Sequence, residues 1–185
     1  LSQGKIDAVL CDDQPAKAFL RQNPTLKILD EVFVEETYAG VIAKNNTALL
    51  DTVNMALKSL KISGTYDSIF NTYINRSSDF HYTQKVKSEN KLILSTNAQF
   101  PPYEFHSANG IEGIDIEIAR YIADYMNRSL EIQDIEFDAI INSVNSGKAD
   151  IGLAGFTITE ERKKSILFTT PYRSEERRVG KECVH

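Results

Sequence analysis

The sequence has 185 residues, of which 42% are hydrophobic and 25% are charged, and its formal net charge at pH 7 is -5. This composition is typical of a soluble globular protein with enough chain for one or two small domains. The acidic balance argues against nucleic acid or an anionic membrane as a partner. No segment has the length of a membrane span, and no signal peptide is recognisable, although Leu1 predicts a cut N-terminus. The two cysteines, Cys11 and Cys183, are too few and too far apart to establish a disulfide.

The chain begins with a helix-ending glycine, Gly4, and a short apolar strand that stops at Asp12. A related pattern recurs over residues 147–155, which favours two similar α/β lobes, although Gly-Lys-x-Asp is also a common helix-to-strand joint. Between the two copies, helices are expected over 14–21, 50–60 and 66–73, and strands over 26–29 and 38–43.

From residue 76 to residue 90 the chain is polar and has no periodicity, which predicts a linker between two modules. His81 in this stretch is expected to be solvated, because no second metal ligand stands at a useful spacing.

A second module is expected to begin after the linker. A buried strand over 92–95 is followed by helices over 113–127 and 137–145 and by strands over 130–135 and 149–153. Strands and helices that alternate with short joints predict an α/β fold, with a mostly parallel sheet flanked by helices.

Ligands of such sheets lie at the carboxyl ends of the strands, and three loops are expected at that edge. They contain Asn97 and Phe100, then Phe137, then the segment from Gly155 to Arg162. An arginine fork, a hydroxyl and an accessible backbone N–H suit a carboxylate ligand. Alternatively, Thr159 with two glutamates caps a helix and leaves Arg162 as a solvated surface charge.

Five ordered motifs carry a resemblance to a known family. They are Phe-Pro-Pro-Tyr-Glu-Phe (100–105), Gly-Ile-Asp-Ile-Glu-Ile-Ala (113–119), Phe-Asp-Ala-Ile-Ile (137–141), Gly-Lys-Ala-Asp (147–150) and Ala-Gly-Phe-Thr-Ile-Thr-Glu-Glu-Arg (154–162). With them, residues 91–172 resemble the N-terminal lobe of the family-3 bacterial solute-binding proteins, which bind polar amino acids for ABC transporters. The third loop is most similar to that of the glutamine-binding members. The resemblance implies a periplasmic-binding-protein-like fold of type II.

The resemblance also implies roles for individual residues. Arg162 would clamp the α-carboxylate of the ligand, helped by the Gly155 N–H and the Thr157 hydroxyl. Phe100 and Phe137 would enclose the aliphatic part of the ligand. Many members have an aspartate where this chain has Asn97, so a neutral ligand such as glutamine is expected rather than lysine or arginine.

Residues 1–75 resemble the closing part of the same family, whose terminal strand aspartate accepts the α-ammonium group; here that is Asp12, with Asp13 as a competitor. Because the tail of one module precedes the head of another, the chain is expected to cross two tandem modules. Asp12 and Arg162 would then belong to different sites. The other arrangement left open is self-complementation, in which residues 37–75 complete the downstream lobe as in a circular permutation.

The resemblance ends at Tyr172, and residues 173–183 match the translation of a common short-read sequencing adapter. Residues 173–185 are therefore expected to be an artefact and not part of the fold. A charged surface helix or tail is the other interpretation.

The predicted function is non-catalytic capture of a polar amino acid between two lobes that close by a hinge, for delivery to the permease of an ABC transporter. The expected location is extracytoplasmic, either periplasmic or at the cell surface, with a membrane tether left open. A sensor domain of a histidine kinase is one alternative, and a dehydratase or a transglycosylase-linked module is another, although no isolated catalytic acid supports an enzyme. No cofactor, metal or nucleic-acid partner is predicted.

Overall fold

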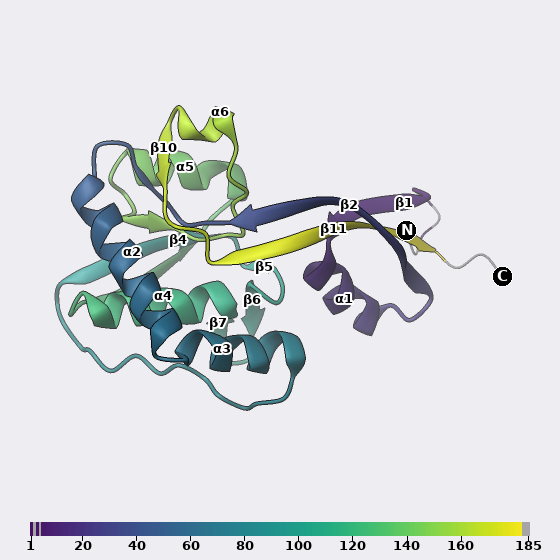
Figure 1. Ribbon diagram of the computed structural model, residues 1–185, viewed down its shortest axis with the longest axis horizontal. Coiled ribbons are helices and arrows are strands. Elements are labelled where there is room, and N and C mark those ends of the chain that lie inside the picture. Colours follow the sequence, from purple (N-terminus) through teal and green to yellow (C-terminus); the bar gives the residue numbers. More distant parts are fainter. Residues whose placement is uncertain (2, 4, 183–185) are drawn as a thin grey trace.

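The computed structural model describes residues 1, 3 and 5–182, which form a main lobe and a smaller lobe joined by two long strands (Figure 1). The helices are α1 (Asp13–Gln22), α2 (Thr47–Ile62), α3 (Thr65–Phe70), the π-helical turn η1 (Asn71–Asn75), α4 (Ile114–Tyr125), α5 (Phe137–Asn145) and α6 (Glu160–Lys163). The strands are β1 (Ala8–Asp12), β2 (Leu26–Tyr38), β3 (Val41–Ala43), β4 (Lys91–Thr96), β5 (Gln99–Phe100), β6 (Glu104–Ser107), β7 (Gly110–Glu112), β8 (Ser129–Asp134), β9 (Ile151–Gly152), β10 (Ile166–Phe168) and β11 (Arg173–Glu182). The α/β class predicted from the sequence is confirmed.

The main lobe is built on a five-stranded sheet in the order β10-β3-β9-β4-β8. β4 is parallel to β8 and β9, as the alternation of strands and helices predicts. β3 lies between β9 and β10 and is antiparallel to both. A segment from the first quarter of the chain therefore completes a sheet made by the second half, which is the self-complementing arrangement left open by the sequence.

Both faces of this sheet are covered by helices, and the apolar residues alternate accordingly. Leu92 and Leu94 of β4 belong to a large core cluster with α2 and α4, whereas Ile93 packs with the cluster around α5. On α4, Ile114, Ile118 and Ile122 recur at helical spacing and are fully buried. Residues 38–75 and 91–172 thus contribute together to both hydrophobic clusters.

The start of α4 depends on a glycine. Gly113 has a φ of 131°, and a Cβ there would lie 2.1 Å from the carbonyl oxygen of Tyr103. Only glycine allows the chain this close approach. The amide of Asp115 then donates to the same Tyr103 carbonyl at 2.9 Å, which joins α4 to the loop that carries Phe100.

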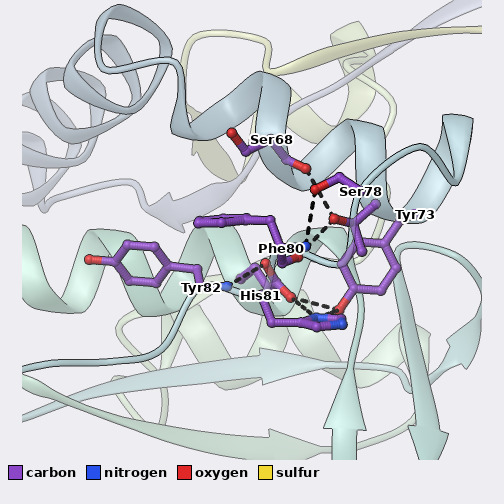
Figure 2. A network of polar contacts seen from close by, with 8 residues as sticks. Ser68, Tyr73, Ser78, Phe80, His81 and Tyr82 are labelled. Atoms are coloured by element: carbon purple, nitrogen blue, oxygen red, sulfur yellow. Dashed lines mark hydrogen bonds and ion pairs between the residues drawn. The ribbon is translucent and has the colours of Figure 1, made fainter.

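The segment over residues 76–90 has no helix or strand, yet carboxylates of α4 bind its backbone amides. Phe80, His81 and Tyr82 of this segment belong to a network of polar contacts (Figure 2). Glu117, which is fully buried, accepts from Tyr73 Oη at 2.7 Å and from the Tyr82 amide at 2.9 Å. About two turns further on, Asp124 accepts from the amides of Lys85 and Val86, each at 2.9 Å. These side chains take the place of the missing backbone partners, so the predicted linker packs as a strap on the main lobe.

His81 is exposed to solvent, as expected, and its ring also contacts a buried carboxylate. Its side chain is 56% exposed, but its Nδ1 lies 2.8 Å from Oε1 of the buried Glu117. The sequence shows no local sign of this contact, because the two residues come from different elements.

The small lobe is a three-stranded antiparallel sheet, β1-β11-β2, with α1 packed beside it. β2 is longer than the four residues expected at 26–29, because it continues to Tyr38 along β11. The residues interpreted as an adapter scar form β11 over 173–182, and residues 183–185, including Cys183, lie outside the described part. The assignment of 173–185 to an artefact stays a prediction.

Replacement of the buried carboxylate that holds the strap is expected to destabilise the main lobe. Glu117→Ala would leave the Tyr73 hydroxyl and the Tyr82 amide without their acceptor, at a cost of about 2–4 kcal/mol in the free energy of unfolding. Urea denaturation followed by circular dichroism measures this cost. Glu89→Ala, an exposed position in the same strap, is the matched control and should change stability by less than about 0.5 kcal/mol. Equal stability of the two variants would contradict the strap's structural role.

Candidate ligand-binding cavity

A cavity of about 810 Å³ opens where the main lobe meets the small lobe. All seven residues predicted to bind the ligand line it: Asp12, Asn97, Phe100, Phe137, Gly155, Thr157 and Arg162. They come from the end of β1, the loops after β4 and β9, the strand β5, and the starts of α5 and α6. The structure therefore brings together residues that are up to 150 positions apart in the chain.

Asp12 differs from its expected place, because the tandem interpretation puts it in a different site from Arg162. The buried Tyr38, at the end of β2, explains the difference. Its hydroxyl donates to the Asp12 carboxylate, and its backbone forms a bridge with Thr157. The small lobe thereby holds Asp12 against the same cavity as Arg162. Asp13 does not line the cavity and pairs instead with Lys17.

Arg162 is oriented by three contacts within the main lobe. Its Nη1 donates to the carbonyl oxygen of Thr157 at 3.0 Å. Its guanidinium carbon lies 5.6 Å from the ring centre of Phe137 and 5.4 Å from that of Phe156, within the range of cation–π attraction. Thr159 caps α6, as the alternative interpretation expects, but Arg162 is half-buried at the cavity and is not a solvated surface charge.

The two aromatic residues expected to enclose the ligand each line the cavity with a second ring behind them. Phe137 stacks on Phe156, with ring centres 4.8 Å apart, and Phe100 stacks on Tyr103 at 5.6 Å. Gly155 lies next to Phe100, and a Cβ there would lie 2.8 Å from that ring. This glycine, with a φ of 55°, is therefore needed for the close packing of the loop.

Two donors expected to assist Arg162 are engaged by carboxylates of the protein. The Gly155 amide donates to Oδ2 of Asp115 at 3.2 Å, and the Thr157 hydroxyl donates to Oε2 of Glu36. Neither carboxylate was identified from the sequence as part of the site. Asp115 stands within one of the recognised motifs, but nothing in the motif marks its contact with the loop after β9.

Asp115 and Glu104 form a fully buried pair of carboxyl groups behind the cavity. Burial raises the pKa of Asp115 to about 6, against hydrogen bonds from Tyr172 and Gly155 that lower it. Burial, and then the charge of Asp115, raise the pKa of Glu104 well above its ordinary range. Two adjacent buried carboxylates repel each other when both are charged, so the pair favours a state in which one of the two groups keeps a proton.

Among the described residues, no group of three or more histidine, cysteine, aspartate or glutamate side chains could hold a metal ion. No helix in the described part of the chain has the length and apolar character needed to cross a membrane.

Residues 92–182 match the model of the bacterial extracellular solute-binding proteins, family 3. The arginine-binding extracellular protein ArtP of Bacillus subtilis is 37% identical over 82 residues, which cover 44% of this chain and 32% of the relative. The probable ABC transporter arginine-binding protein ArtJ of Chlamydia trachomatis is 38% identical over 87 residues, which cover 46% of this chain and 34% of that relative. The chain thus spans about a third of the length of these curated relatives.

Among solved structures, a point mutant of the arginine-bound form of domain 1 from TmArgBP is 36% identical, with a TM-score of 0.45, and the match covers 50% of this chain and 78% of that one. The family match extends past Tyr172, where the sequence motifs end, and includes β11.

The buried carboxyl pair predicts a pH dependence of stability with a definite sign. Asp115 has an ordinary pKa of 3.8 when unfolded and about 6 in the folded protein, so the folded state holds the proton more tightly. This group therefore lowers the free energy of unfolding as pH rises from about 4 to about 6, and the penalty is complete above that window. Asp115→Asn should remove this contribution, which urea denaturation between pH 4 and pH 7 measures as a changing difference from the wild type. The exposed Asp51→Asn is the control, and parallel pH profiles for Asp115→Asn and the wild type would contradict the assignment.

Proposed function

We propose that the cavity binds a free polar amino acid without changing it chemically. The observation that carries the proposal is that Arg162 is held in a fixed orientation at the cavity. Its guanidinium is oriented by Thr157 and two rings, lines the cavity, and forms no ion pair with any described residue. A half-buried arginine with this geometry presents two N–H groups that suit both oxygens of an α-carboxylate.

Asp12 supplies the opposite charge for the same ligand. Its carboxylate comes from the small lobe and lines the cavity that Arg162 lines from the main lobe. An α-amino acid carries a carboxylate and an ammonium group on one carbon, so it can bridge the two lobes. The ligand favours the arrangement in which both contacts form, and only to the extent that it binds that arrangement more tightly.

Two features of the cavity bear on the side chain of the ligand. Asn97 donates its Nδ2 to the Ile135 carbonyl at 3.0 Å, so its Oδ1 is oriented as an acceptor for an N–H group of the ligand. An amide such as that of glutamine satisfies this acceptor, and so does a guanidinium. Besides the buried Glu104, whose pKa is raised, the lining contains three acidic residues (Asp12, Glu36 and Glu161), whereas Arg162 is the only basic residue among the described residues of the lining. This charge balance, and the names of the arginine-binding relatives, support arginine beside glutamine as a ligand.

We further propose that the protein works outside the cytoplasm and delivers its ligand to the permease of an ABC transporter. The family match and the curated relatives support this role, since they are extracellular solute-binding and ABC transporter binding proteins.

Removal of the guanidinium is expected to abolish amino-acid binding. Arg162→Ala should weaken binding of arginine or glutamine by at least about 100-fold in isothermal titration calorimetry, because the ligand carboxylate loses its charged partner. Lys163→Ala removes a neighbouring positive charge that pairs with Glu160 outside the cavity and serves as the control. Near-native affinity in Arg162→Ala would refute the carboxylate clamp.

A carboxylate at position 97 is expected to shift the preference toward a cationic ligand. Asn97→Asp should improve the ratio of arginine to glutamine affinity by roughly tenfold, because a charge-assisted hydrogen bond replaces a neutral one. Competition calorimetry with both amino acids gives this ratio. An unchanged ratio would show that Asn97 does not contact the side chain of the ligand.

A further inference from the structure

The Thr157 hydroxyl, which is part of the proposed carboxylate site, already has an acidic partner in this structure. It donates to Oε2 of Glu36, a residue 121 positions earlier in the chain. The backbone carbonyl oxygen of Thr157 accepts a hydrogen bond from Nη1 of Arg162. Thr157 therefore lies between the Glu36 carboxylate and the Arg162 guanidinium. Glu36 lines the cavity together with both of them.

The position of Glu36 follows from the strand that carries it. Glu36 stands two residues before Tyr38 on β2, so both side chains lie on the same face of the strand. Tyr38 fixes that face toward the cavity through its bridge with Thr157 and its contact with Asp12. Glu35 and Thr37, on the opposite face, are exposed.

A hydroxyl group has one proton to donate, so Thr157 cannot donate to Glu36 and to a ligand carboxylate at the same time. The negative charge of Glu36 also repels a second carboxylate at short range. From this geometry we propose that Glu36 is an internal competitor for the α-carboxylate of the ligand. It occupies the Thr157 hydroxyl in the ligand-free protein and lowers the affinity for every α-amino acid.

The proposal rests on the proposed function, because it assigns the site of Arg162 and Thr157 to the carboxylate of an amino acid. It also sets Glu36 apart from Asp12. Asp12 would attract the ammonium group of the ligand, whereas Glu36 would compete with the carboxylate. Loss of Glu36 should therefore strengthen the binding of carboxylate-bearing ligands.

The test is calorimetry on the full chain with arginine, glutamine and agmatine, which is arginine without its α-carboxylate. Glu36→Ala should lower the Kd of the α-amino acids by about tenfold, equivalent to about 1.4 kcal/mol, and should not tighten agmatine binding. Glu35→Ala removes the same charge from the other strand face and should leave all three affinities unchanged. Circular dichroism confirms that each variant is folded.

A second variant isolates the shared hydroxyl. Thr157→Val removes the donor for which Glu36 and the ligand compete, so Glu36→Ala in this background should give a gain well below tenfold.

Three outcomes would overturn the proposal alone, provided that the wild type binds an amino acid: weaker binding in Glu36→Ala, no change in it, or an equal gain in Glu35→Ala. An absence of amino-acid binding in the wild type and in every variant would instead overturn the proposed function, and this proposal with it.

Discussion

The hydrogen bonds that β3 forms on both of its edges are the constraint on which the rest of the structure depends. β3 pairs with β9 on one side and β10 on the other, so the five-stranded sheet is continuous only when this early segment lies within it. The insertion fixes the end of β2 next to the loop after β9, where Tyr38 bridges Thr157. From that point the small lobe is held at the edge of the sheet where ligands of α/β folds bind.

The same insertion explains the charges around the cavity. Carboxylates reach the loop after β9 from two directions: Asp115 from the start of α4, and Glu36 from β2. Asp115 is buried and accepts from Tyr172 as well as from Gly155, so its contact is part of the packing of the loop. Glu36 is only half-buried and faces the cavity, so its contact can be exchanged for one with a ligand. Two similar hydrogen bonds thus differ in role because they differ in burial.

The sequence predicted those elements whose signal is local. The isoleucines of α4 and the short joints around β4, β8 and α5 defined the α/β class, and the resemblance located Arg162 and its loop. Long-range contacts were not predictable in the same way. The length of β2 depends on β11, a partner that the adapter interpretation had set aside. The contact of His81 with Glu117 joins a polar stretch to a helix 36 residues away, and nothing in either segment marks it.

For Asp12, the residue type and the strand end predicted a role in ligand binding, whereas the order of segments in the chain predicted a different binding site. Its type and its position at a strand end were sufficient to nominate it as the partner of an ammonium group. Its position before the linker assigned it to a different module from Arg162, yet the two line one cavity. The strap over residues 76–90 makes the shared cavity possible, because its amides are satisfied by Glu117 and Asp124 on α4 instead of by a second module. A segment fixed in this way connects η1 to β4 along the main lobe, so the permuted order of the segments allows one main lobe that carries Arg162 beside a small lobe that carries Asp12.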